Sequence, residues 1–404
     1  MKYTNNIIIT YKFRAYPTSE QEVKIQEIFN IETQIYNAMI KRIKEMNAKN
    51  KKIIEEDLKQ IIYELKNLWE NKVYYAIIYS IEKRLFGNLK GLYKLKKRNK
   101  KVGTLKLKKK FSYLFYKHHG FKIESDGILL LKIGKIKVHF HRPIKGKVIG
   151  VGIKKDKDNK WYTFIIVKLN KKPLPKTGKI VAIDWGIEKL ITTSDGYAIE
   201  NPLIWDKLEK RIKKLQKVLS RKKVNSKNYE KIRIRLAKFY KYSQNLMNDY
   251  LHKITTWLIE NYDIIYVEDI SIKKLVHMNQ SKKLRKHILN TSYHKFLEML
   301  IYKAKLYGKQ VIKVSPKNTS KKCSRCGYIN RKLSLKDRIF KCPKCGLIID
   351  RDYNATLNIL NAGLGRPQVP VEGKPLIYIP FSKVVYSKFP MKQEIKSTGR
   401  EIKN

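Results

Sequence analysis

Hydrophobic residues repeat with two different periods in the first part of the chain. Apolar residues alternate with other residues from Ile7 to Phe13, which predicts a strand within residues 1–18. A helix-capping sequence follows at Thr18, and apolar residues then recur at helical spacing without an interrupting proline. Residues 19–100 are therefore predicted to form an all-helical block.

A period of two returns after the helical block. From Ile133 to Phe140, apolar residues lie among lysines and histidines, a pattern typical of strands with one buried face. The N-terminal strand can pair with these later strands. Residues 1–18 and 101–172 are therefore predicted to form one split β-barrel, with the helices inserted between its two parts.

The second half of the chain alternates short buried strands with helices. Apolar runs at residues 180–183 and 264–267 predict buried strands, and stretches with helical spacing lie between and after them. This order is typical of an α/β layer, which we assign to residues 176–317 and 347–365. The last 39 residues, 366–404, contain five prolines and no clear period, so we expect a tail with little order.

All four cysteines lie close together in the sequence, in two pairs. Cys323 and Cys326 form one C-x₂-C pair, and Cys342 and Cys345 form the other, fifteen residues later. A glycine follows each pair, so each can sit on a tight turn. Four thiolates at about 2.3 Å suit a tetrahedral Zn²⁺ ion. Because no position is left open, we predict a structural zinc ribbon over residues 318–346.

The charge of the chain narrows its possible partners. Its 404 residues include 90 Lys and Arg against 34 Asp and Glu, which gives a formal net charge of +56. This excess excludes most ordinary metabolic enzymes, because so much like charge destabilises a compact chain unless polyanions bind it. Basic residues run through the whole chain rather than along one amphipathic helix, which favours nucleic acid over a membrane surface. A polycation without catalytic activity is the alternative.

The sequence also predicts where the protein resides. No apolar run approaches the roughly 18 residues of a membrane span. The N-terminus lacks the long apolar segment and small-residue cleavage site of a signal peptide. We therefore expect a cytoplasmic protein that does not bind a membrane.

Basic and aromatic residues predict where nucleic acid binds. Residues 88–110 contain eleven Lys and Arg and no acid, which we interpret as a mobile connector facing a polyanion or as a solvated linker. Aromatic residues at 111–116 can stack on bases or fill the barrel core. The helix near residues 206–219 carries basic residues that suit either a nucleic-acid backbone or solvent. The candidate contacts are Lys108, Lys109, Lys110, Tyr113, Tyr116, Lys210, Arg211, Lys214 and the ribbon residue Arg325.

Three carboxylates stand beside buried segments. Asp184 and Glu268 each end an apolar run, and Asp352 follows the ribbon. Taken singly, such an acid is more typical of a helix cap or a surface group, since burying a carboxylate is costly without a partner. Together, in a strongly basic chain, they predict an oxygen-ligand site for Mg²⁺ or Mn²⁺ that hydrolyses phosphodiesters.

The same residues resemble the motifs of a known family. Residues 183–187, 267–270 and 350–355 resemble the three RuvC motifs of TnpB proteins, which are transposon-encoded RNA-guided nucleases. Residues 319–327 resemble the start of the family's zinc ribbon. The resemblance covers roughly residues 7–365, and type V CRISPR effectors share the same catalytic core.

The resemblance implies a fold and an activity. The expected fold is bilobed: a split β-barrel wedge domain with a helical recognition insertion, then an RNase H-like (RuvC) α/β domain interrupted by the zinc ribbon. Asp184, Glu268 and Asp352 would hold Mg²⁺ or Mn²⁺ and catalyse cleavage. A monomer would bind a guide RNA, read a short motif beside the target and cut double-stranded DNA in a prokaryotic cell. A strand-transferring DNA transposase and an RNA-guided repressor without cleavage are the alternatives.

Overall fold

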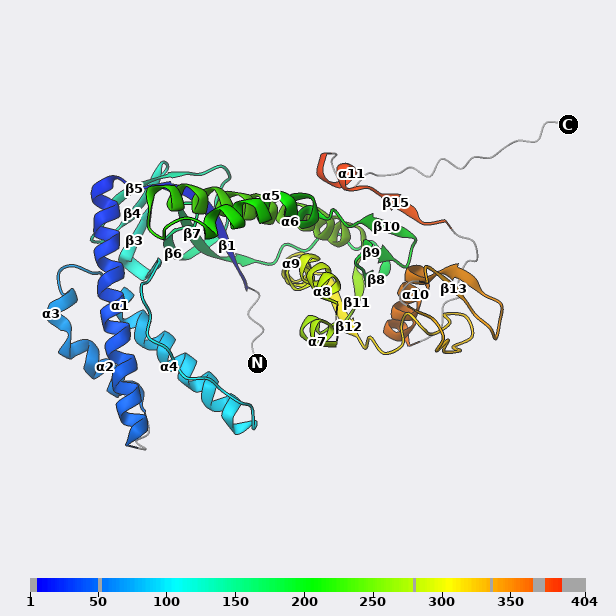
Figure 1. Ribbon diagram of the computed structural model, residues 1–404, viewed down its shortest axis with the longest axis horizontal. Coiled ribbons are helices and arrows are strands. Elements are labelled where there is room, and N and C mark those ends of the chain that lie inside the picture. The colour runs from blue at the N-terminus through cyan, green and yellow to red at the C-terminus, as the bar shows by residue number, and fades with distance from the viewer. Residues whose placement is uncertain (1–5, 50–52, 279–280, 335–336, 366–374, 387–404) are drawn as a thin grey trace. The chain divides into compact units, whose positions relative to one another are not determined.

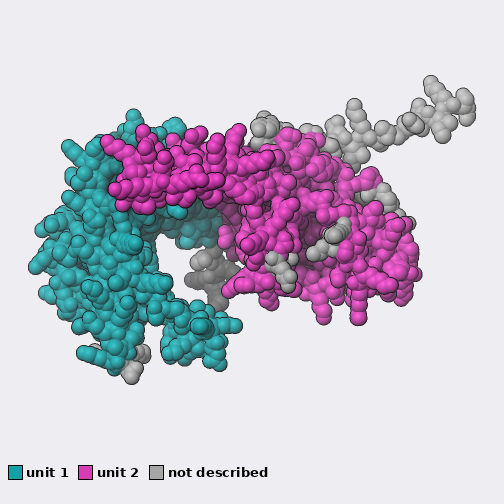
Figure 2. Space-filling model, in the orientation of Figure 1, with its two compact units in different colours: residues 1–170 teal, residues 171–404 magenta. Residues whose placement is uncertain are grey.

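A seven-stranded antiparallel sheet organises residues 1–170, the first of two compact units in the computed structural model (Figures 1 and 2). The strand order is β2-β6-β7-β1-β5-β4-β3. The strand β1 lies between β5 and β7, so the sheet combines two parts of the chain that are separated by helices. The strands are β1 (Asn6–Tyr16), β2 (Tyr113–Lys117), β3 (Phe121–Ile123), β4 (Gly127–Leu130), β5 (Gly134–His139), β6 (Lys147–Lys155) and β7 (Trp161–Asn170).

The two edge strands of this sheet, β2 and β3, are joined by a single short 3₁₀ turn, His118–Gly120. The sheet must therefore curl until its edges approach each other, which makes a nearly closed barrel. Alternate side chains fill the interior, among them the fully buried Phe13, Ile136 and Ile165.

Four helices lie between β1 and β2 in the sequence. The predicted cap is confirmed: the Thr18 hydroxyl accepts the Gln21 N–H at 3.3 Å, and the Gln21 side chain accepts the Thr18 N–H at 3.0 Å. The helices pack against one another and bury their apolar faces, for example Ile35 and Ile40 of α1 and Ile78 of α4. They are α1 (Ser19–Ala48), α2 (Glu55–Glu64), α3 (Lys66–Trp69) and α4 (Tyr75–Lys97).

The interpretation of residues 88–110 as a mobile connector is wrong for much of that segment. Its first ten residues form the end of α4. Further on, the Asn37 side chain of α1 donates to the Lys108 carbonyl and accepts its N–H, both at 2.9 Å. The run is basic, but helical hydrogen bonds and contacts with α1 fix its course.

A six-stranded sheet forms the centre of the second unit, residues 171–404, in the order β12-β11-β8-β9-β10-β15. The strands β8, β11 and β12 are parallel, and Ile183 of β8 pairs with Val267 of β11. Parallel neighbours end at the same edge of a sheet, so the residues that follow this pair lie side by side. The strands are β8 (Ile180–Trp185), β9 (Lys189–Thr193), β10 (Tyr197–Glu200), β11 (Ile264–Glu268), β12 (Gln310–Val314) and β15 (Ile377–Ile379).

Helices cover both faces of this sheet. Val181 and Ile265 point to one face and pack with Leu258 of α6 and other residues of α6 and α9. Ala182 and Tyr266 point to the opposite face and pack with α10. The helices are α5 (Ile204–Ser220), α6 (Lys227–Asn261), α7 (Ile272–Met278), α8 (Lys282–Asn290), α9 (Tyr293–Tyr307), α10 (Arg351–Leu364) and α11 (Phe381–Tyr386).

The predicted tail, expected to be partly ordered at best, is ordered at residues 375–386. The strand β15 pairs in parallel with β10, and the buried side chains of Ile379 and Val384 join the core of the second unit. The Phe381 N–H also donates to the Glu200 carboxylate at 2.6 Å. A three-residue strand and a six-residue helix are too short to show a period in the sequence.

The structure describes residues 6–49, 53–278, 281–334, 337–365 and 375–386. The remainder of the predicted tail lies outside these residues. Within these ranges, no helix is both long and apolar enough to cross a lipid bilayer.

Candidate functional site

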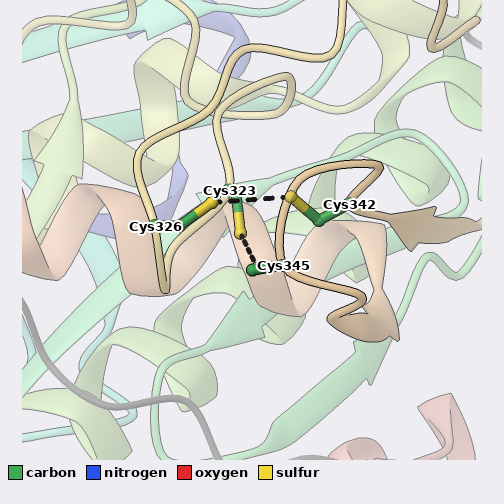
Figure 3. A group of neighbouring side chains, drawn as sticks. All are labelled: Cys323, Cys326, Cys342 and Cys345. Carbon is green, nitrogen blue, oxygen red and sulfur yellow. Dashed lines mark hydrogen bonds between the residues drawn. The ribbon is translucent and has the colours of Figure 1, made fainter.

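The four cysteines converge on one point (Figure 3). Their sulfur atoms all lie within 4.8 Å of one another. Cys323 Sγ is 3.6 Å from Cys345 Sγ, and Cys326 Sγ is 3.5 Å from Cys342 Sγ. Four thiolates bound at about 2.3 Å around a tetrahedral ion would lie about 3.8 Å apart, so the donor set fits a metal.

Two matching turns produce this convergence. The N–H of Gly327 donates to the carbonyl of Cys323, and the N–H of Gly346 donates to that of Cys342, both at 3.0 Å. Both glycines have positive φ, 76° and 73°, which a side chain would oppose. The second turn links β13 (Ile339–Lys341) to β14 (Ile348–Asp350), which leads directly into α10.

The three predicted carboxylates are brought together by the sheet and α10. Asp184 ends the apolar run of β8, Glu268 ends β11 beside it, and Asp352 lies in the first turn of α10. Burial, together with the nearby charges of Glu268 and Asp352, raises the pKa of Asp184 well above its usual range. Burial also raises the pKa of Glu268.

Two of the carboxylates have neighbours that the sequence reasoning did not identify. The Thr319 hydroxyl donates to the Glu268 carboxylate. Lys189 Nζ lies 3.4 Å from Asp352, and the Arg351 guanidinium lies 3.3 Å from it. The contacts of Thr319 and Lys189 join distant segments, so no local sequence pattern indicates them, whereas Arg351 directly precedes Asp352 in the chain.

The two candidate metal sites differ in how closely their potential ligand atoms lie to one another. Among the described residues, the four cysteines are the one group of three or more potential ligands close enough to share an ion. The three carboxylates interact electrostatically, but their oxygens do not converge to the same degree. A shared divalent ion would require the oxygens of the three carboxylates to lie closer together than they do here.

Asp350, the acid two residues before Asp352, has a structural role. It is the N-cap of α10, and its side chain accepts the N–H groups of Asp352 and Tyr353, both at 3.0 Å. Lys189 Nζ binds its other oxygen at 2.7 Å. Asp350 therefore fixes the start of the helix that carries Asp352.

Three family models match parts of the chain. A helix-turn-helix domain model matches residues 5–52, a model described as a probable transposase matches 163–279, and the Cas12f1-like TNB domain model matches 293–359. In the structure, the described part of the first segment, residues 6–49, forms β1 and one continuous helix, α1.

Known proteins resemble the chain along most of its length. A Streptomyces pristinaespiralis protein is 27% identical over 88% of this chain and 89% of its own, and InsQ of Escherichia coli K12 is 27% identical over 91% and 96%. Both are named as RNA-guided DNA endonucleases. TnpB-like protein MJ0751 of Methanocaldococcus jannaschii is 32% identical over 42% of this chain and 58% of its own.

The chain is similar to TnpB proteins along most of its length. A solved structure supports the fold: the chain in a complex titled Cas12f1-sgRNA-target DNA aligns with a TM-score of 0.57 and 16% identity, covering 89% of this chain and 100% of that chain. At this identity, the likeness concerns the fold.

The predicted nucleic-acid contacts differ in exposure. Tyr116 is fully buried in the barrel and donates to the Leu131 carbonyl at 3.2 Å, so the prediction that it contacts a base is wrong. Tyr113 is half-buried on the sheet. Lys108 Nζ lies 4.2 Å from the centre of the Phe111 ring, a cation–π contact within the first unit. The exposed candidates are Lys108, Lys109, Lys110, Lys210, Arg211, Lys214 and Arg325.

Proposed function

We propose that the protein is an RNA-guided DNA endonuclease of a transposable element, which cuts double-stranded DNA at one carboxylate site. The observation that carries this proposal is the meeting of Asp184, Glu268 and Asp352 at the end of the parallel strands β8 and β11. Relatives that match nearly the whole chain are named RNA-guided DNA endonucleases, which supports the same activity.

The second unit supplies an RNase H-like (RuvC) nuclease domain in this proposal. The carboxylates of Asp184, Glu268 and Asp352 would hold Mg²⁺ or Mn²⁺. Bound divalent ions supply an activated water and stabilise the oxygens of the phosphodiester in the transition state. The chain places the three acids on adjacent elements, and Lys189 and Arg351 balance their charge.

The four cysteines would hold Zn²⁺ as a structural ion. Four thiolates are a donor set typical of structural zinc, and no ligand position remains for a substrate. The wedge domain is assigned to residues 1–18 and 101–172, and the recognition domain to 19–100. The nuclease domain then comprises 176–317 and 347–365, with the ribbon at 318–346.

A guide RNA and target DNA are the proposed partners. The net charge of +56 supports a large polyanionic partner, because the exposed lysines and arginines would otherwise repel one another. Lys210, Arg211 and Lys214 are exposed on α5, and Lys210 and Lys214 lie on the side away from its buried Ile212 and Leu215. They are suited to contact a nucleic-acid backbone.

Cleavage of a plasmid tests the proposal. The full chain is purified with the RNA that binds it, the RNA is sequenced, and a plasmid that matches its variable end is supplied with Mg²⁺. We expect cutting by the wild type and none by Asp184→Ala, with RNA binding retained. Asp269→Asn is the matched control, because Asp269 follows Glu268 but is exposed and pairs with Lys313 at 2.9 Å.

Two outcomes would contradict the proposal. Equal cutting by the wild type and Asp184→Ala would refute the site. Joining of transposon ends by the protein without RNA would favour a transposase, the activity named by the family model that matches residues 163–279.

A further inference from the structure

Thr319 joins the cysteine ribbon to the carboxylate site. Its hydroxyl donates to the Glu268 carboxylate, and both residues are buried, each 9% exposed. The Glu268 backbone is held separately, because the Tyr293 hydroxyl donates to its carbonyl. A glutamate side chain has three rotatable bonds, so fixed backbone alone does not orient its carboxylate. Thr319 supplies that orientation.

The backbone around Thr319 is held by two buried amides of α10. Asn358 Nδ2 donates to the Thr319 carbonyl at 2.8 Å and to the Lys322 carbonyl at 2.6 Å. Asn354 Nδ2 donates to the same Lys322 carbonyl at 2.8 Å, and its Oδ1 accepts the Ser324 N–H at 3.0 Å. The two asparagines are four residues apart and lie on one face of the helix.

Both ends of the ribbon thus meet at the carboxylate site. Cys323 directly follows Lys322, which the asparagines hold, and the second cysteine pair leads through β14 into the turn of α10 that carries Asp352. A metal on the four cysteines would lock these two segments together. We propose that Thr319 is a positioning residue for Glu268, and that the cysteine site organises the carboxylate site through residues 319–324 and α10.

This inference rests on the proposed function of the carboxylates as a divalent-metal site. Loss of the Thr319 hydroxyl leaves the buried Glu268 carboxylate without that hydrogen bond. Divalent-metal binding that requires an oriented Glu268 carboxylate should then weaken by about tenfold or more. Thr319→Val should therefore raise the Mn²⁺ concentration needed for half-maximal cleavage, and for half-maximal thermal stabilisation, by about tenfold. Thr319→Ser keeps a hydroxyl and should stay near the wild-type value.

Thr356→Val is the matched control. Thr356 is fully buried in α10, and its hydroxyl donates to the Tyr353 carbonyl at 2.7 Å rather than to a carboxylate. It should lower the melting temperature without changing the Mn²⁺ midpoint. Asn358→Leu should increase hydrogen exchange at residues 319–324, because it removes the two hydrogen bonds that Asn358 donates to that segment.

The experiment uses the full chain with its co-purified RNA and two readouts. One is the Mn²⁺ dependence of plasmid cleavage, and the other is the Mn²⁺-induced rise in melting temperature, which needs no cleavage. If the wild type cuts and Thr319→Val has the same Mn²⁺ midpoint as the wild type in both readouts, the inference is overturned. If the wild type does not cut but its Mn²⁺-induced stabilisation depends on Thr319, the proposed nuclease activity is overturned and the positioning role is supported.

Discussion

A buried glutamate in the helical part of the first unit makes stability depend on pH. Glu32 of α1 is 2% exposed, and its Oε2 has no hydrogen-bond partner among the described residues. Burial raises its pKa from 4.5 to about 8, despite the nearby charges of Arg84 and Lys108, which lower it. The folded state therefore holds a proton that the unfolded chain releases above pH 4.5.

The raised pKa of Glu32 gives the free-energy cost of keeping this carboxyl protonated in the folded state. The folded state binds more protons than the unfolded state between pH 4.5 and 8, so stability falls as pH rises through this range. A pH of 7 lies 2.5 units above 4.5, the pKa of this group in the unfolded chain. At about 1.36 kcal/mol per unit, the free energy of unfolding is lowered by about 3 kcal/mol at pH 7. At pH 4.5 and below, the cost is close to zero.

The prediction is that Glu32→Gln stabilises the first unit at pH 7 by up to about 3 kcal/mol, or roughly 6–12 °C in melting temperature. The gain should shrink steadily towards pH 4.5. Melting of the full chain is measured between pH 4.5 and 8 for the wild type, Glu32→Gln and Glu27→Gln. Glu27 is an exposed glutamate on the same helix, so its variant controls for the loss of one charge. A difference between wild type and Glu32→Gln that does not change with pH would refute the reasoning.

Three further predictions concern the second unit. Complete removal of metal from the cysteines, verified by elemental analysis, should lower the melting temperature and increase hydrogen exchange at residues 319–324; unchanged exchange would contradict the role given to the ribbon. Gly363→Ala should lower the free energy of unfolding, measured in urea, by about 1–3 kcal/mol, because its Cβ would lie 2.3 Å from the Tyr266 ring. Gly178→Ala is not a suitable control, because Gly178 has a positive φ that strains any side chain. Gly91→Ala is the control, because there is open space around Gly91. Val384→Asp should expose the C-terminal segment to protease, because it buries a charge in the core, and equal digestion of wild type and variant would contradict that docking.

The sequence was most informative where a pattern is local. The spacing of Cys323, Cys326, Cys342 and Cys345 predicted a convergence that the structure contains, because two C-x₂-C-G turns determine most of the geometry by themselves. Thr18 and the helix it caps are equally local. The seven-stranded, nearly closed sheet followed from alternation in the strands on either side of the helices.

Long-range contacts could not be predicted in the same way. Thr319 acquires its role only because the segment before the ribbon passes Glu268, fifty-one residues earlier in the sequence. Tyr116 follows a run of lysines, yet alternation within β2 turns it into the barrel. The catalytic role of the three carboxylates stays a prediction, although the structure places Asp184 and Glu268 on neighbouring strands.

The strand β15 has a consequence for how the protein is made. Its partner β10 is synthesised long before it, and most of the second unit lies between them in the sequence. Until residues 377–379 leave the ribosome, the edge of β10 exposes unpaired backbone groups, which are prone to pair with other chains. The sheet that carries two of the acids is thus completed only when β15 has been made, so a newly made chain remains vulnerable to aggregation until that strand has been synthesised.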